Sequence, residues 1–546
     1  MRHTIRRSSQ SLLAVSAVAL PLLAAPLRGQ DADSLRIGVH EVFAAGEMEE
    51  YLRFLQIGGS SALYPWSIRA FSPGELDRLA PKTDAHPWAA RYSLGSDTTG
   101  APRFDLLRPS LDLVYNSAFP HGGNDGPVWA GRGLTTALRF GVSARYGPLS
   151  LVLAPTVFRA QNAEFDLAEN GLPEELRFAD PLDPLSIDLP QRFGDDAYVR
   201  VDPGQSTLRL DARGVAVGVS TANQQWGPAS RLPILLGNNA GGFPHLFVGT
   251  SSPANVFVGR VHARLVWGRL EQSAYSTVGA DSATRFMSGL VATFVPRGVP
   301  GLELGLGRFF HSVWPDEGLD ADYFLRPVNT FFKAGTADPN DTIPAVRSDN
   351  QLVSVFARWA FPESGVEVYG EYGREDANWD LRDFLVEPDH VSGYMLGLRK
   401  LWRHADRRFL TLRGELLNTQ VSHLARVRAQ GPFYRHTYAR QGHTHRGQLL
   451  GAASGYGGGG WFLGGDYYHP GGRWSGFLAR DLRNHQGVTF APSVERDVLY
   501  SLGGESLLFR GRFDVLTGLT GVYEYNRDLR GNAFNLNLTL RVDADL

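Results

Sequence analysis

The chain has 546 residues with 54 basic and 56 acidic side chains, and its formal net charge of -2 argues against a nucleic-acid-binding protein, which normally carries a basic excess. Cysteine is absent, which excludes disulfide frameworks, thiolate metal sites and cysteine nucleophiles. Beyond the N-terminus no apolar run reaches the ~18 residues of a membrane-spanning helix, so the sequence excludes a helical membrane protein.

Residues 1–30 have the pattern of a secretory signal peptide. Arg2, Arg6 and Arg7 give a positive start, an apolar stretch follows at 12–25, and small residues come after it. No cysteine follows that could carry a lipid anchor. We therefore expect cleavage between residues ~25 and ~32 and export of the remaining chain.

Residues 31–104 predict a small helical domain. Apolar residues recur at helical spacing in 41–57, and a capping box at 72–75 with proline at the first helical position opens a second helix. Asp84 and Pro87 predict the start of a third short helix. If the rest of the chain spans the outer membrane, this domain is periplasmic.

From about residue 105 onward, apolar residues alternate with polar ones. The pattern is clearest at 533–543 and recurs at 133–146, 256–270 and 407–421. A long succession of such strands in an exported chain is typical of a transmembrane β-barrel, whose backbone must close on itself in lipid. A β-propeller or solenoid is the alternative, but the chain shows no repeat of fixed period.

The strand count follows from the segments that are long enough to span a membrane. There are about sixteen, and two short apolar segments at 231–237 and 244–251 could pair to make ~18. We predict a transmembrane antiparallel β-barrel of 16 to 18 strands, 18 being favoured, over residues 105–546. Tight connections such as 146–148 then face the periplasm and the long ones face outward, which places the protein in the bacterial outer membrane.

The inward face of this barrel carries charges of both signs, among them Arg260, Arg264, Glu367 and Glu415. The segment 221–255 contains little spanning strand, and we expect it to fold inward, occlude the lumen and pair with Arg260 and Arg264. The alternative is that the charges line a water-filled pore, as in a porin or diffusion channel.

One part of the barrel resembles a known family. The segment 214–250 carries a characteristic set of residues: Asn223, Trp226, Gly227, Pro228, Asn238, Asn239, Phe243 and Pro244. It resembles the Wzi-type outer-membrane capsule assembly proteins, and the resemblance extends over most of 105–546. It implies an occluded barrel with a small periplasmic helical bundle that associates surface polysaccharide with the cell, and the polysaccharide export machinery as an expected partner.

Two interpretations of this motif stay open. Trp226 before Gly-Pro fits an interfacial anchor in a tight turn, and Asn238 and Asn239 tolerate a left-handed turn conformation. The second interpretation is that these side chains contact sugar directly.

A second candidate site lies between Glu415 and Asp466, where the chain has no acidic residue. Its polysaccharide-binding candidates are Arg426, Arg428, Tyr434, Arg435, His436, Tyr438, Arg440, His443, His445 and Arg446. Guanidinium groups match the carboxylates of uronic acids, so we expect an acidic surface polysaccharide to bind here, more tightly as histidines gain protons near pH ~6.5. The alternatives are pairing with the acidic segment 161–205 or with anionic headgroups of outer-membrane lipid.

Signals for catalysis are weak. His443 and His445 share one face of a strand, but no carboxylate lies near them in sequence. The chain has no G-x-S-x-G, HExxH, P-loop or dinucleotide-binding motif. We therefore predict a protein that is not an enzyme and that needs neither a metal nor a cofactor.

Overall fold

The computed structural model describes residues 36–95, 102–329, 349–375, 381–483 and 496–545, apart from the side chains of Asp383 and Arg426. The predicted signal peptide lies outside the described residues. From Ile37 onward the chain forms one compact unit. Within the described ranges no helix is both long and apolar enough to cross a membrane.

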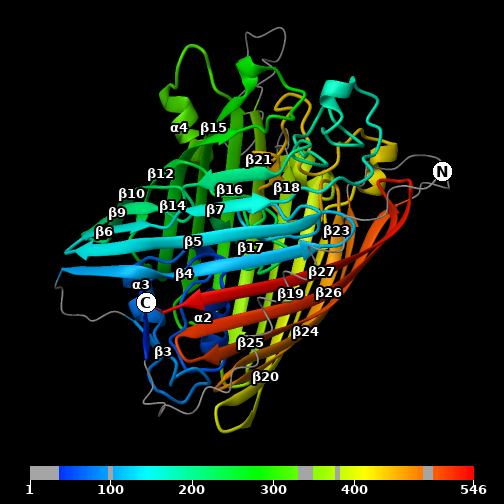
Figure 1. The fold of residues 1–546 in the computed structure, drawn as a ribbon. Coiled ribbons are helices and arrows are strands. Elements are labelled where there is room, and N and C mark those ends of the chain that lie inside the picture. The colour runs from blue at the N-terminus through cyan, green and yellow to red at the C-terminus, as the bar shows by residue number, and fades with distance from the viewer. Residues whose placement is uncertain (1–35, 96–101, 330–348, 376–380, 484–495, 546) are drawn as a thin grey trace, which may run out of the picture. The chain divides into compact units, whose positions relative to one another are not determined.

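This unit is a closed antiparallel β-barrel (Figure 1). Three of its strands are each broken into two segments, β6 with β7, β8 with β9 and β12 with β13, so the wall has 18 strands. The segments of the wall are β4 (Arg103–Asn116), β5 (Gly133–Tyr146), β6 (Leu149–Leu153), β7 (Thr156–Ala160), β8 (Tyr198–Asp202), β9 (Thr207–Ala212), β10 (Val215–Ser220), β12 (His245–Thr250), β13 (Ala254–Val256), β14 (Gly259–Glu271), β15 (Thr284–Pro296), β16 (Leu302–Val313), β17 (Asp349–Phe361), β18 (Val366–Glu375), β19 (Ser392–Ala405), β20 (Arg408–Asn418), β23 (Gly459–His469), β24 (Gly472–Arg483), β25 (Asp497–Arg510), β26 (Phe513–Arg527) and β27 (Gly531–Ala544).

The alternation in each strand decides which side chains face the membrane. In β27, Phe534 and Leu538 are exposed on the outer face, whereas Asn535 is fully buried toward the lumen. The last strand pairs with the first, beginning at Asn537 opposite Asn116, and this pairing closes the sheet on itself. The predicted 18-strand antiparallel barrel is confirmed.

Two parts of the wall differ from the prediction. Residues 206–220, expected as one span, form the hairpin of β9 and β10, because Arg213 and Gly214 adopt φ angles of 51° and 85° and reverse the chain. The alternation continues through this turn, so the sequence pattern hides it. Residues 231–237 are not a strand and lie buried in the lumen, whereas 244–251 does enter the wall as β12.

The N-terminal segment contains β1 (Ile37–Val39), α2 (Glu47–Ile57), β2 (Ile68–Arg69), α3 (Pro73–Leu79) and β3 (Tyr92–Leu94). α3 begins at the predicted capping box, where the Ser72 N–H donates to the Glu75 carboxylate at 2.8 Å. The third predicted helix is wrong, since residues 87–91 form a turn. Trp88 stacks there on Tyr51, with ring centroids 3.9 Å apart, and this tertiary contact overrides the local pattern.

This segment fills the end of the barrel where the strands are joined by tight turns. Tyr51, Leu55 and Trp66 are fully buried in one core with Leu401 and Phe409 of the wall. Figure 1 shows α2 and α3 at the lower end of the barrel and the long connections at the upper end. Because outer-membrane barrels keep short turns on the periplasmic side, the filled end is the periplasmic end.

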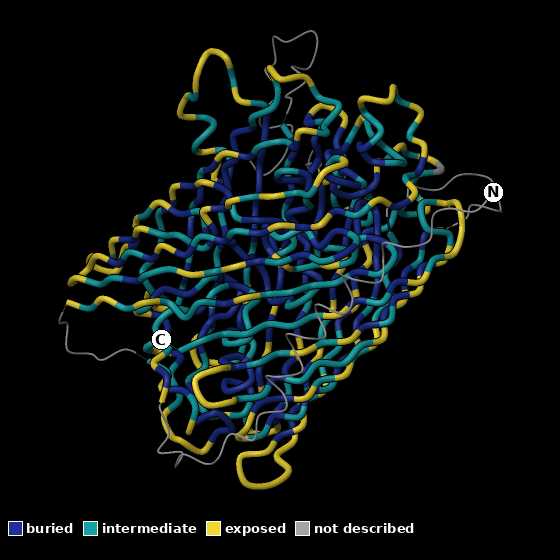
Figure 2. Tube along the Cα trace, viewed as in Figure 1, coloured by how far each residue is buried: buried dark blue, intermediate teal, exposed yellow. Residues whose placement is uncertain are grey.

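The long connections at the other end contain short elements: β11 (Gln225–Trp226), β21 (Thr444–His445), β22 (Gln448–Leu449), η1 (Glu174–Leu176), η2 (Ala280–Ser282), α4 (Ala321–Asn329), α5 (Leu381–Val386) and η4 (His423–Arg426). Figure 2 shows buried residues running through the interior and exposed residues gathering at loop tips and turns. The protein's core is therefore the barrel lumen.

Candidate functional site

The segment 221–244 folds down into the lumen and meets the N-terminal segment. β11 pairs with β2, and the Gly227 N–H donates to the Ser67 carbonyl at 3.0 Å. Trp226 is fully buried, and a Cβ on Gly289 of the wall would lie 2.6 Å from its ring. The predicted entry of this segment into the lumen is confirmed.

One wall carboxylate fixes the deepest part of this segment. Glu415 accepts backbone N–H hydrogen bonds from Ser230 at 2.7 Å and from Arg231 and Leu232 at 2.9 Å each. Three charge-assisted bonds to backbone replace the water that the carboxylate loses on burial. The segment is therefore held by specific polar contacts as well as by apolar packing.

Of the two arginines expected to meet the segment, Arg264 donates to the Gln224 side-chain oxygen at 2.9 Å. Arg260 lies at the β13–β14 hairpin, opposite Asn255 in the strand register. The structure thus gives Arg264 a partner in the lumen and places Arg260 at the periplasmic turn.

The family motif is held together by its own amides. Asn223 donates to the Asn238 side-chain oxygen and to the Ala240 carbonyl, both at 2.7 Å. Asn238 donates in turn to the Asn124 carbonyl at 2.7 Å, and Asn239 to the Leu449 carbonyl at 3.2 Å. Trp226, Gly227, Pro228 and Phe243 are buried, and Pro244 is exposed. These contacts give the motif a packing role in this structure.

Ion pairs tie the N-terminal segment to the wall. Arg53 pairs with Glu367 at 3.0 Å, and Arg399 of the wall pairs with Glu50 at 2.7 Å. Glu303 accepts hydrogen bonds from the backbone N–H groups of Trp66 and Ser67, just before β2, at 2.7 and 2.9 Å. Burial alone would raise the pKa of the Glu50 carboxyl, but the Arg399 guanidinium holds it well below its usual range. The N-terminal segment is therefore held to the wall by ion pairs, and Glu50 stays ionised at neutral pH.

The candidate residues between Glu415 and Asp466 divide into a buried and an accessible group. Tyr434, His443 and His445 are buried: Tyr434 donates to the Ile234 carbonyl and His443 to the Leu235 carbonyl, both at 2.6 Å, and His445 accepts the Glu271 N–H at 3.1 Å. Burial lowers the pKa of His443 to about 4 and that of His445 well below its usual range. A pH effect near neutrality therefore cannot come from these two histidines.

The arginines of the same segment lie closer to solvent and contact acidic residues or carbonyls. Arg428 pairs with Glu387 at 2.6 Å, Arg435 with Asp183, and Arg446 with Glu271 at 2.8 Å and Asp202 at 3.4 Å. Arg440 donates to the Leu185 carbonyl at 2.9 Å. His436 is buried and accepts the Ala439 N–H, Tyr438 is 54% exposed, and the side chain of Arg426 lies outside the described residues. Partners at 183, 185 and 202 come from the acidic segment 161–205, as one of the alternatives predicted.

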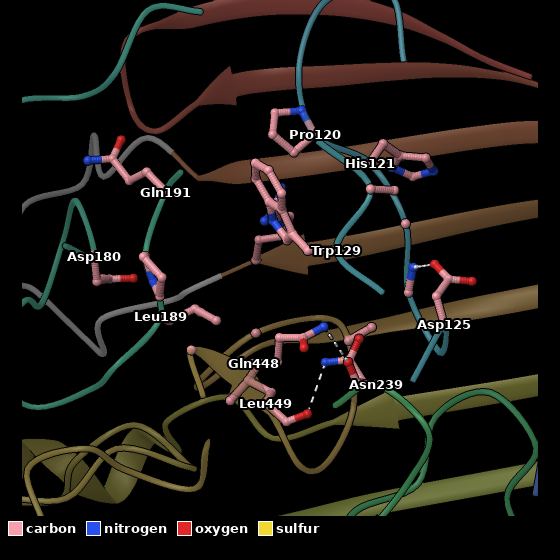
Figure 3. Close-up of a pocket in the computed structure, with 18 of the residues that line it drawn as sticks. Pro120, His121, Asp125, Trp129, Asp180, Leu189, Gln191, Asn239, Gln448 and Leu449 are labelled. Atoms are coloured by element: carbon pink, nitrogen blue, oxygen red, sulfur yellow. Dashed lines mark hydrogen bonds between the residues drawn. The ribbon is translucent and has the colours of Figure 1, made fainter. Parts of the chain in front are cut away.

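A polar cavity of about 170 Å³ lies among the long connections. Figure 3 shows Trp129 near its centre, with Asp125, Asp180, Asn239 and Gln448 around it. Gln448 donates to the Asn239 carbonyl at 3.3 Å, so the family motif and the basic segment meet at this cavity. The structure thereby brings together two candidate groups that are about 200 residues apart in the chain.

Asp180 has the most unusual environment in this cavity. One carboxylate oxygen accepts hydrogen bonds from the Tyr456 hydroxyl at 2.9 Å and from the N–H groups of Leu182 and Asp183 at 3.0 and 2.6 Å. Among the described residues, its other oxygen is buried without a hydrogen-bond partner. Burial raises the pKa of Asp180 to about 7. Asp180 lines the cavity, but this oxygen is buried behind the cavity surface.

Comparison with protein families identifies the chain. The family model described as capsule assembly protein Wzi matches residues 123–525, which is most of the sequence. The chain belongs to the Wzi family. Together with the barrel, this membership makes it a bacterial outer-membrane protein. No curated protein matches the sequence.

Solved structures were compared for their fold. The Wzi barrel of Escherichia coli, described as an outer-membrane protein involved in group 1 capsule assembly and as a carbohydrate-binding β-barrel, has a TM-score of 0.60 and 13% sequence identity. The likeness covers 93% of this chain and 100% of that chain, and it shows a shared fold. A BenF-like porin from Pseudomonas fluorescens Pf-5 and OpdQ from Pseudomonas aeruginosa each have a TM-score of 0.39, with 9% and 8% identity over 81% and 82% of this chain and 99% and 97% of theirs.

The sequence did not predict that residues in the connections 117–132 and 180–191 line the cavity. The available signal was Trp129, a large aromatic residue inside a long glycine-rich connection, where binding residues often lie. Asp180 gave no local signal, because its burial depends on Tyr456 far along the chain. Within the described ranges no group of three or more His, Asp or Glu side chains is placed to hold a metal ion.

Proposed function

We propose that this Wzi-family protein binds surface polysaccharide at the extracellular end of its barrel and so holds the polymer on the cell. The proposal rests on one observation, a polar cavity at the long-loop end of a barrel whose lumen is packed with buried side chains. The packed lumen disfavours a porin, because a diffusion channel needs a continuous path for water. We propose binding without chemistry on the polymer.

The cavity offers the groups that sugars need. The Trp129 side chain supplies an apolar surface for a sugar ring, and the Asn239 and Gln448 amides lie beside it. The Asp180 oxygen without a partner is buried at the cavity wall, and a ligand hydroxyl that reaches it on binding would supply its missing hydrogen bond. A ligand that supplies this donor removes the cost of burying an unpaired acceptor.

An acidic polymer is favoured by accessible arginines in the long connections at the same end of the barrel. Arg428 pairs with Glu387, Arg435 with Asp183, and Arg440 with the Leu185 carbonyl. A guanidinium carries five N–H donors, so a side chain that uses some of them in the protein can still offer others to a uronic acid carboxylate. Tyr438 is exposed beside them. Binding through such screened surface charges should weaken as salt rises.

The central test measures oligosaccharide binding by Trp129→Ala and Asp180→Asn variants in detergent. Both variants should bind fragments of the cell's own surface polymer at least roughly tenfold more weakly, as expected for loss of one buried contact. Trp402→Ala, on the outer face near the periplasmic turn, is the matched control and should bind normally. Normal binding by both cavity variants would remove the cavity from the site.

A second test concerns the arginines and is made on cells. Replacing Arg428, Arg435 and Arg440 by alanine should lower the amount of cell-attached polymer while secretion continues. The matched control replaces three exposed periplasmic-turn arginines, Arg407, Arg408 and Arg512, and should retain the polymer. Unchanged retention in a well-folded triple variant at 428, 435 and 440 would show that these arginines do not contribute to binding.

A further inference from the structure

The barrel wall is incomplete on one side at its extracellular end. β10 and β12 have six residues each, fewer than the ~9–11 that a strand needs to span the membrane. β12 pairs with β14 only as far as Gly268, and β8 pairs with β7 alone among the described strands. Between β8 and the last residues of β14 the wall therefore has a notch.

The notch is sealed from the lumen by the β21–β22 hairpin. The Arg446 guanidinium pairs with Glu271 of β14 at 2.8 Å and with Asp202 of β8 at 3.4 Å, which are the two sides of the notch. The Arg446 N–H also donates to the Glu271 carbonyl at 2.8 Å. This seal separates the polar interior from the outer face of the wall.

Outside the seal, the notch forms an apolar groove of about 580 Å³ on the face that points toward the membrane. Its lower side consists of exposed outward-facing residues: Leu153, Leu208, Val219 and Leu246. α4 lies over its upper side, where Trp267 donates to the Phe324 carbonyl at 2.9 Å and Phe286 contacts the Phe324 ring at 5.4 Å. Figure 1 shows α4 above β12 and β10 on the same side of the barrel.

The groove's hydroxyl side chains already have hydrogen-bond partners in the protein, whereas the buried Nε2 of His245 has none among the described residues. Thr207 and Ser220 share a hydrogen bond at 2.7 Å, Thr221 donates to the Gly204 carbonyl at 2.9 Å, and Ser206 to the Pro203 carbonyl at 2.6 Å. The groove therefore suits an apolar occupant without hydrogen-bonding groups. A polypeptide segment would bring backbone N–H and C=O groups that this surface does not satisfy.

A positively charged side chain, Arg269, lies at the extracellular margin of the groove. Arg269 follows Trp267 on the outward face of β14, lines the groove, and has a side chain that is 54% exposed. Its only acidic contact among the described residues is Glu271, at 3.4 Å. An arginine at the membrane surface, beside an apolar groove, fits an anionic headgroup whose chain enters the membrane.

We propose that this groove binds one acyl chain of a phosphorylated, multiply acylated glycolipid of the outer leaflet, with a phosphate of its headgroup beside Arg269. The notch shortens the wall where the outer leaflet meets it. An acyl chain in the groove would take the place of the missing strand residues and cover the apolar side chains that the notch leaves open. This lipid site lies on the opposite side of the Arg446 seal from the polysaccharide cavity and does not depend on the proposed function.

Native mass spectrometry of the full-length barrel with added phosphorylated glycolipid tests this inference. The wild type should retain one glycolipid molecule through detergent exchange, Leu246→Trp should fill the groove and retain none, and Leu412→Trp, at an exposed position on β20, should retain one. Arg269→Ala should bind roughly fivefold more weakly, with Arg269→Lys close to wild type.

Heat-modifiable gel migration confirms that each variant is folded. Equal retention by Leu246→Trp and Leu412→Trp, or no retained lipid in the wild type, would overturn the proposal. Equal affinity for a dephosphorylated glycolipid would overturn the role of Arg269. A dimer mass that disappears in Leu246→Trp would show that a second copy, and not a lipid, occupies the groove.

Discussion

At Asp180, burial makes the charge of a single carboxyl depend on pH near neutrality. Its pKa is raised from 3.8 to about 7, so the folded state disfavours the ionised form. The resulting destabilisation begins as pH rises above the unfolded value and is complete above the folded pKa. Raising the pH from 6 to 8 should therefore lower the unfolding temperature of the wild type. Asp180→Asn should reduce this dependence, measured by heat-modifiable migration, while Glu41, whose pKa burial raises to about 8, still contributes to it. An equal pH dependence in the variant would contradict the role of Asp180.

Gly227 is the motif position whose backbone cannot accept a side chain. Its φ is +89°, and a Cβ would lie 2.8 Å from a Glu371 carboxylate oxygen. Gly227→Ala should destabilise the barrel by about 1–3 kcal/mol, as strain at such a position does. The matched control is Gly431→Ala, where nothing lies within 4 Å and the change should be neutral. Thermal unfolding of both variants in the same detergent decides the comparison, and equal stability would contradict the strain.

At the scale of elements, α2 depends on charge pairs with the wall. Glu50 bonds Arg399 and the Ser230 hydroxyl, each at 2.7 Å, so it joins the helix to both the wall and the lumen segment. Because the folded pKa of Glu50 is low, this stabilisation is present above its unfolded pKa of ~4.5 and is lost as pH falls below it. Hydrogen exchange of α2 should stay slow from pH 7 to pH 5.

The same helix should loosen when the charge is removed. Glu50→Gln removes the nearer of the two carboxylates that pair with buried Arg399 and leaves Glu367 at 3.5 Å, so it should destabilise the docking of α2 and speed its exchange. Adding Arg399→Met should restore much of the protection, because no unpaired charge then remains. Exchange in β27 is the internal reference. Unchanged α2 exchange in the single variant would show that apolar packing alone holds the helix.

The elements also show what a sequence can and cannot predict. Alternation predicted the strands, because each span has one lipid-facing side, and the capping box predicted the start of α3. The β9–β10 hairpin was missed because alternation continues through Arg213–Gly214. The cavity and the buried histidines could not be predicted, since they depend on contacts between residues such as His443 and Leu235 that are far apart in sequence.

On the scale of the whole molecule, the lumen is filled from both ends. The N-terminal segment packs into the periplasmic end, and 221–244 comes down from the extracellular end to pair with it through β2 and β11. Two cores, one around Trp226 and one around Trp66, occupy the interior. Such an arrangement fits a barrel that presents a binding surface outside rather than a path through the membrane.

Planar-bilayer recordings test this arrangement. The intact protein should show no stable open channel, because water cannot cross two packed cores. Glu303→Ala with Glu415→Ala removes the acceptors of five backbone N–H bonds that hold the two lumen segments, and should produce transient openings. Glu363→Ala, at an exposed periplasmic turn, is the control and should stay closed. A stable channel from the well-folded intact protein would contradict the occluded lumen and return the porin to consideration.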